Sequence, residues 1–177
     1  MRTLFALGII AITAFARDPS ARPRAAACGP AGVDFDVRDD PSHPEEQPEH
    51  GKAFVYVIQD DGAGNCFESL WGGCVTTRVG LDGAWTGATH HNSWIAFNVD
   101  PGERHLCVTL QSRLKNASQL VGLAHFQAEA GKTYYFRTRA FGRAGGSQVF
   151  LDLDPIDSDQ GKFMVGSFRY SVSNPRR

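Results

Sequence analysis

Two adjacent histidines in this 177-residue chain, His90 and His91, could bind a metal ion. Imidazole is a common metal ligand. Neighbouring side chains on a strand point to opposite faces of the sheet, however, so the two could share an ion only on a loop. Neither belongs to a His-Glu-x-x-His motif or a comparable spacing. The sequence therefore predicts no metal site and no cofactor.

A run of aspartates near the C-terminus resembles a calcium site at first: Asp152, Asp154, Asp157 and Asp159. A twelve-residue calcium loop opening at Asp157 would have Phe168 at its closing acidic position, so the pattern fails. A structural role is the alternative. If residues 133–139 and 149–154 form a hairpin, Arg137 and Arg139 share a face with Asp152 and Asp154, as cross-strand ion pairs would.

The sequence contains no complete catalytic motif. Cys74 follows two glycines and has no neighbouring base, which favours a turn before a strand over a nucleophile. A Gly-x-Ser-x-Gly elbow is absent. We therefore expect that the chain is not an enzyme. A hydrolase that assembles its site from distant residues, such as His91 and Asp100, is kept as an alternative function.

The chain has four cysteines, at Cys28, Cys66, Cys74 and Cys107. They allow three pairings, of which we favour Cys66 with Cys74 and Cys28 with Cys107. The first pair flanks a short segment ending in two glycines, where a turn can bring the α-carbons within about 4.4–6.8 Å. Cys107 lies between two apolar residues of a predicted strand. If those residues face the core, its sulfur points outward, where the N-terminal segment carrying Cys28 can meet it.

Three aromatic side chains are candidates for ligand binding, namely Trp85, Trp94 and Tyr135. Trp94 lies off the face of Ile95, Phe97 and Val99, so it is expected on the outer face of its sheet. There its ring could stack on a sugar or a protein, or it could be covered by the Pro-rich segment or a short helix. A carbohydrate-binding module that uses these rings is therefore a second alternative function.

Residues 1–16 have the layout of a secretory signal peptide, with Arg2, an apolar run of 13 residues and a cleavage site after Ala16. The run is shorter than the roughly 20 residues that span a membrane, so we expect no membrane span. Ala25-Ala26-Ala27-Cys28 resembles a lipoprotein box only weakly. A secreted or periplasmic location is expected in preference to a lipid anchor at Cys28. The net charge of -1 gives no reason to expect nucleic-acid binding.

Residues 17–51 are predicted to be a Pro-rich acidic linker, because they contain six of the nine prolines and a cluster of aspartates and glutamates. We expect no regular element there and little contribution to the core, except where Cys28 tethers it. The folded domain is predicted over residues 52–177.

In that domain the apolar residues recur mainly with period two, as in strands. Turn signals divide the pattern into about eight strands, at residues 54–58, 75–81, 94–99, 106–110, 121–128, 133–139, 149–154 and 168–172. The dipeptide Asp82-Gly83 predicts a hairpin turn. Asp157 is expected to cap one short helix that ends near residue 166. The pattern predicts an all-β sandwich or barrel with one short helix near the C-terminus.

Several turns and strand ends resemble those of the bacterial domain-of-unknown-function family 2846. They are Gly51-Lys52-Ala53-Phe54-Val55-Tyr56-Val57, Val79-Gly80-Leu81-Asp82-Gly83, Val99-Asp100-Pro101-Gly102-Glu103, Glu129-Ala130-Gly131-Lys132-Thr133-Tyr134-Tyr135-Phe136-Arg137 and Asp159-Gln160-Gly161-Lys162. The resemblance implies a β-sandwich similar to carboxypeptidase-regulatory-like and transthyretin-like modules, in exported proteins that are often lipoproteins. It implies no catalytic residues. The leading expectation is therefore a non-enzymatic exported module that binds an unknown protein or glycan of the cell envelope or serves as a scaffold.

Overall fold

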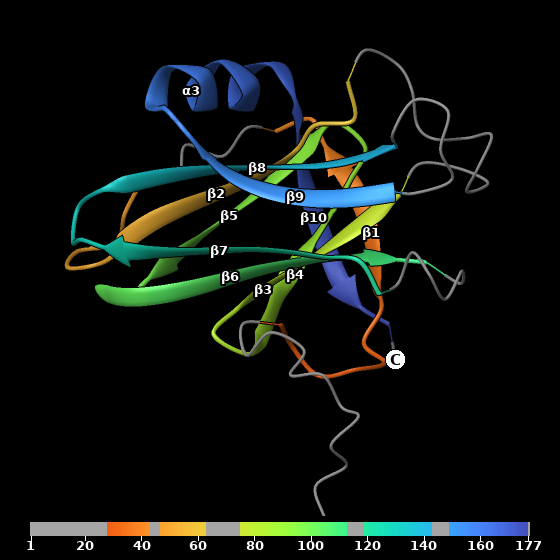
Figure 1. The fold of residues 1–177 in the computed structure, drawn as a ribbon. Helices are drawn as coiled ribbons and strands as arrows, with labels where there is room; N and C mark the ends of the chain where they lie inside the picture. The colour runs from red at the N-terminus through yellow and green to blue at the C-terminus, as the bar shows by residue number, and fades with distance from the viewer. Residues whose placement is uncertain (1–27, 43–46, 63–74, 113–118, 143–148, 177) are drawn as a thin grey trace, which may run out of the picture.

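A computed structural model of the chain describes residues 28–42, 47–62, 75–112, 119–142 and 149–176. Within these ranges, ten strands form two sheets that face each other, and one helix, α3 (Ser158–Ser167), lies over the outer face of the larger sheet (Figure 1). The strands are β1 (Phe35–Asp40), β2 (Ala53–Gln59), β3 (Thr76–Leu81), β4 (Ala84–His90), β5 (Ser93–Val99), β6 (Gly102–Gln111), β7 (Val121–Ala128), β8 (Thr133–Gly142), β9 (Val149–Ile156) and β10 (Arg169–Pro175).

The larger sheet has six strands in the order β1-β10-β5-β2-β8-β9, and the smaller has four in the order β4-β3-β6-β7. Two pairs in the larger sheet, β10 with β5 and β2 with β8, are parallel, and the other pairs are antiparallel. The predicted all-β sandwich with one short helix is confirmed. Each of the eight predicted strands is present, and β1 and β4 are additional.

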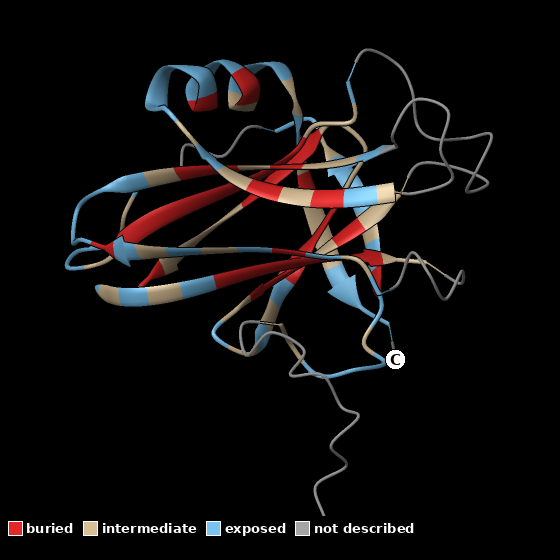
Figure 2. Cartoon of the chain, viewed as in Figure 1, coloured by how far each residue is buried: buried red, intermediate tan, exposed pale blue. Residues whose placement is uncertain are grey.

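The main core lies between the two sheets. Its buried residues include Val55, Val57, Val79, Ile95, Leu106, Val108 and Phe136. A second, largely aromatic cluster fills the space between the larger sheet and α3, and consists of Phe54, Tyr56, Ile58, Trp94, Tyr135 and Met164. Because β2 contributes to both clusters, all seven of its residues are buried, as its continuous apolar run predicted (Figure 2).

Two local signals in the sequence are confirmed. Asp82 and Gly83 join β3 to β4 with positive φ angles of 48° and 87°, the conformation that an Asp-Gly hairpin turn requires. Asp157 caps α3, since its carboxylate accepts hydrogen bonds from the backbone N–H groups of Asp159 at 3.0 Å and Gln160 at 2.9 Å.

The prediction that residues 17–51 form no regular element is wrong for β1. This strand pairs with β10 along its whole length, from Phe35 opposite Pro175 to Asp40 opposite Tyr170, and the side chain of Phe35 is buried. The apolar residues Phe35 and Val37 alternate with charged ones, a strand pattern that the surrounding prolines obscured. The larger sheet therefore includes residues N-terminal to the predicted domain boundary at residue 52.

Strand β4 was not predicted, because its buried residues are small. Gly87, Ala88 and Thr89 are buried where β4 packs against the larger sheet. The backbone N–H of Ala88 donates a hydrogen bond of 3.0 Å to the hydroxyl of Ser173 on β10. Small residues allow this close approach of the two sheets but give no apolar alternation in the sequence.

None of the helices in the described ranges is both long enough and apolar enough to cross a lipid bilayer.

Candidate functional site

Two of the three aromatic residues nominated for ligand binding lie in the interior. Trp94 on β5 is fully buried, and its Nε1 donates hydrogen bonds to the carbonyls of Val165 at 3.1 Å and Phe168 at 3.3 Å. Tyr135 on β8 is also buried, and its ring stacks on that of Tyr56 with centroids 5.0 Å apart. The interpretation of these rings as a surface platform is wrong. The alternative, in which the short helix covers Trp94, is confirmed.

Trp85 lies on the outer face of the smaller sheet and fixes the N-terminal segment. Its Nε1 donates to the carbonyl of Pro30 at 2.8 Å, and the guanidinium of Arg78 lies 5.0 Å from the ring centroid. Gly29 packs so closely on the ring that a β-carbon there would collide with it. Trp85 therefore belongs to a different sheet from Trp94 and Tyr135, and the three rings form no common site.

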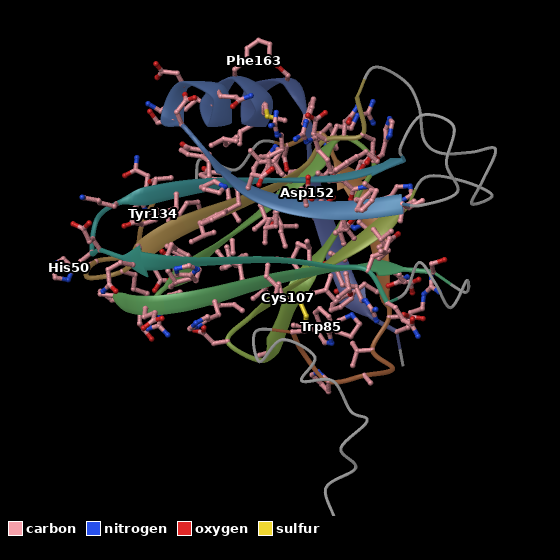
Figure 3. The ribbon with its side chains drawn as sticks, in the orientation of Figure 1. His50, Trp85, Cys107, Tyr134, Asp152 and Phe163 are labelled. Atoms are coloured by element: carbon pink, nitrogen blue, oxygen red, sulfur yellow. A yellow bond between two sulfur atoms is a disulfide. The ribbon has the colours of Figure 1, made fainter. Side chains whose placement is uncertain are left out.

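The predicted disulfide between Cys28 and Cys107 is confirmed. The α-carbons are 5.1 Å apart, and the bond joins the N-terminal segment to the outer face of β6 beside Trp85 (Figure 3). The alternation of side chains along β6 explains the bond, as predicted, because Leu106 and Val108 point into the core and Cys107 points away from it. Cys66 and Cys74, the other predicted pair, lie outside the described residues.

The predicted hairpin with arginines facing aspartates is confirmed. In the β8–β9 register, Arg137 is opposite Asp154 and Arg139 is opposite Asp152. The ion pair that forms is diagonal, with Arg139 Nη2 3.8 Å from Asp154 Oδ2, and Arg137 Nη1 lies 3.9 Å from Asp60 Oδ2 instead. Within the described ranges, no three His, Cys, Asp or Glu side chains are grouped so that they could hold a metal ion.

The histidine pair lies where two sheets meet. His91 and Asn92 form the turn between β4 and β5, and His91 has a positive φ of 58°. Asp100, the partner proposed for His91 in a hydrolase, lies beyond the far end of β5. Seven extended residues at about 3.3 Å each place the two roughly 20 Å apart, so this pair is not formed.

A different carboxylate, Asp61, lies beside His91. The distance from Asp61 Oδ2 to His91 Nδ1 is 3.8 Å, and only 10% of the aspartate side chain is exposed. The backbone N–H of Asp61 donates to Asn92 Oδ1 at 2.8 Å, while Asn92 Nδ2 donates to the carbonyl of Gly62 at 3.1 Å. These bonds fasten the end of β2 to the β4–β5 turn.

Gln59 supplies the rest of this polar site. Its Nε2 donates to both carboxylate oxygens of Asp61, at 3.1 and 3.0 Å, and to the carbonyl of Val75 at 2.9 Å. Its Oε1 accepts a 2.9 Å hydrogen bond from the hydroxyl of Thr89. The network is closed, with each polar atom of the Gln59 side chain bonded.

Burial raises the pKa of Asp61 above its ordinary value of 3.8, although the Gln59 hydrogen bonds and the nearby His91 and His90 oppose the shift. A carboxyl group that holds its proton to higher pH beside an imidazole is equipped for proton transfer. Asp61 could not be recognised from the sequence, because Asp60-Asp61-Gly62 after an apolar run is typical of an exposed turn.

The fold and these contacts define an all-β two-sheet sandwich whose N-terminal segment is fixed by a disulfide and whose β4–β5 end holds a buried carboxyl group. No family model, curated protein or solved structure matches the chain. The resemblance to family 2846 stays a prediction.

Proposed function

We propose that the chain is a non-enzymatic, exported β-sandwich module of the cell envelope or secreted space that binds a protein partner. The observation that carries this proposal is an exposed aromatic pair at the end of the β8–β9 hairpin. Phe141 and Phe150 are directly opposite in register, their ring centroids are 5.6 Å apart, and they are 41% and 40% exposed. Paired exposed aromatic rings are typical anchors of protein interfaces.

The residues around Phe141 and Phe150 favour a protein as the binding partner. By the alternation along the two strands, Phe141 and Phe150 share the outer face of the larger sheet with the oppositely charged Arg139 and Asp152. An apolar centre with charges of both signs beside it matches the usual arrangement of a protein interface. A glycan partner is less well supported, because Trp94 and Tyr135 are buried and Trp85 holds the N-terminal segment.

The disulfide supports export. Disulfides persist in oxidising compartments such as the periplasm or the extracellular space. The Cys28 sulfur bonded to Cys107 cannot also carry a thioether-linked lipid. We therefore favour a secreted or periplasmic form without a lipid anchor at Cys28.

The test is affinity capture from the native envelope fraction after chemical crosslinking. The wild-type chain is compared with a Phe141→Ser/Phe150→Ser variant and with Leu123→Ser, a matched control that removes an exposed apolar residue from the other sheet. We expect one protein that is retained by the wild type and by the control but lost with the double variant. Equal retention by all three, with the double variant folded, would contradict the proposed surface.

A hydrolase is the second candidate, and Asp61 beside His91 is the observation that favours it. The test is a panel of esterase, protease and glycosidase substrates assayed with the wild type and Asp61→Asn. Activity that the asparagine variant loses would replace the binding module by an enzyme as the preferred function.

A further inference from the structure

The outer face of the β8–β9 hairpin carries arginines on one strand and aspartates on the other. Arg137 of β8 is opposite Asp154 of β9, and in the next row on this face Arg139 is opposite Asp152. The row after these is the exposed aromatic pair of the proposed interface. We propose that this hairpin face binds a second copy of the chain through a two-fold axis parallel to the two strands, an inference that rests on the function proposed above.

The cross-strand register makes the hairpin face complementary to itself. Rotation about an axis that runs midway between the strands places β8 of one copy over β9 of the other, with no shift along the strands. Arg139 then faces the partner's Asp152, and Phe141 faces the partner's Phe150. Each contact occurs twice, as in any interface with two-fold symmetry. Because arginines and aspartates lie on different strands, no like charges meet in these rows.

The charged row beside the aromatic pair is poorly paired within one chain. Arg139 Nη2 is 3.8 Å from Asp154 Oδ2, too far for a hydrogen bond, and Arg139 Nε is buried without a hydrogen-bond partner among the described residues. Asp152 forms no ion pair with any residue of the described ranges. A second copy supplies Arg139 and Asp152 with oppositely charged groups, beside aromatic rings that exclude water. The charges therefore favour a second copy as the occupant.

Helix α3 leaves this end of the larger sheet open. It packs on β2, β8 and β10, and Tyr135 is buried beneath it (Figure 1). Phe141 is six residues further along β8, which is roughly 20 Å from Tyr135. Since β9 is an edge strand, the partner's larger sheet ends at its own β9. In the two-fold arrangement α3 therefore lies beside the partner's sheet and does not block it.

Sedimentation equilibrium of the full chain tests the proposal. Six partly exposed side chains cover less than the roughly 800 Å² per partner of a standard interface, so we expect a reversible dimer with a Kd of about 1–100 μM. Phe141→Ser/Phe150→Ser should raise this Kd by about tenfold or more, because the apolar centre is lost. Leu123→Ser is the matched control, since it removes an exposed apolar residue of the other sheet and should leave the Kd unchanged.

Charge reversal tests the two-fold arrangement itself. In a homodimer, Arg139→Asp places two aspartates face to face and Asp152→Arg places two arginines face to face, so each variant alone should dimerise about tenfold or more weakly. An equimolar mixture of the two should recover the affinity, because every contact in the mixed dimer again joins an aspartate to an arginine. A merely misfolded variant would not recover in this way. Thermal unfolding of each variant provides a separate check of folding.

Three results would overturn the second copy as the partner: a wild type that is monomeric at about 1 mM, an unchanged Kd in the aromatic double variant, or no recovery in the mixture. A monomeric wild type that still captures one other protein through Phe141 and Phe150 would leave the proposed function standing. If capture is also equal for the wild type and the double variant, the proposed function fails as well.

Discussion

The side chain of Gln111 forms two hydrogen bonds with the backbone of Phe35, as a neighbouring strand would. Gln111 Oε1 accepts from the N–H of Phe35 at 2.7 Å, and Gln111 Nε2 donates to its carbonyl at 2.9 Å. The residues are 76 positions apart, on the last residue of β6 and the first of β1. This contact ties the larger sheet's edge strand to the smaller sheet and satisfies two backbone groups that β10 leaves unpaired.

Gln111→Ala is therefore expected to destabilise the protein by about 1–2 kcal/mol, because both backbone groups of Phe35 lose their partner. Hydrogen exchange at the Phe35 amide should accelerate more than exchange in β2. Gln127→Ala, a change of the same kind at an exposed position of β7, is the control and should leave both quantities nearly unchanged. Equal stability of the two variants would show that Gln111 does not hold β1.

Removal of the disulfide by Cys28→Ala/Cys107→Ala should lower the free energy of unfolding by more than Gln111→Ala does. The bonded residues are 79 positions apart, and the chain-entropy estimate for a loop of about that length is about 4.5 kcal/mol. Urea unfolding measures the loss. We also expect trypsin to cut the N-terminal segment faster in the variant, since only non-covalent contacts, such as those of Arg78, Trp85 and Gln111, would then hold it. A loss below about 1 kcal/mol would contradict the assigned role of this bond.

The fold class could be predicted from the sequence because most of the strands carry either a period-two pattern or, in β2, a continuous apolar run. β2, with Phe54 to Ile58 apolar throughout, could be assigned as a strand buried on both faces before α3 was placed over it. β4 could not be predicted, because Ala88 and Gly87 are selected by the closeness of the sheets and not by apolar burial. The alternating pattern of β1 was obscured by the surrounding prolines, and its partners β10 and Gln111 are distant in the sequence.

The disulfide could be predicted from the sequence, whereas the contact between Asp61 and His91 could not. The Cys28–Cys107 bond could be predicted because alternation along one strand determines where Cys107 points. The pairing of Asp61 with His91 depends on how the end of β2 meets the β4–β5 turn. This relationship is not a property of one local segment, so no local pattern reveals it.

Asp61→Asn is expected to make the protein more stable than the wild type at neutral pH. Burial raises the pKa of Asp61, so the folded state binds its proton more tightly than the unfolded chain does. This group's contribution to stability is therefore greatest below about pH 3.8 and falls as the pH rises through the folded-state pKa. Asparagine does not ionise, so the stability of the variant does not decrease in this way as the pH rises.

Urea unfolding at several pH values from 4 to 8 tests the direction in which the stability difference between the two proteins changes with pH. The stability of Asp61→Asn relative to the wild type should increase with pH and then level off above the folded-state pKa. A difference that is constant with pH, or that favours the wild type more strongly at pH 8 than at pH 4, would mean that the ion pair with His91 outweighs burial.

Gly161→Ala is expected to destabilise the protein, although alanine is the better helix former by about 1 kcal/mol. Gly161 is buried on the face of α3 that packs on the larger sheet, and a β-carbon there would collide with the ring of Tyr135. The ring cannot move aside easily, because it stacks on Tyr56 within the aromatic cluster. Overpacking of this kind costs about 1–3 kcal/mol.

Gly166→Ala is the matched control in the same helix. No atom lies within 4 Å of the β-carbon that this change adds, so only the helix preference acts, and we expect a stabilisation of up to about 1 kcal/mol. Thermal and urea unfolding of both variants should therefore give opposite signs. If both changes stabilise the protein, the contact between Gly161 and Tyr135 is not tight, and α3 lies further from the sheet than the structure places it.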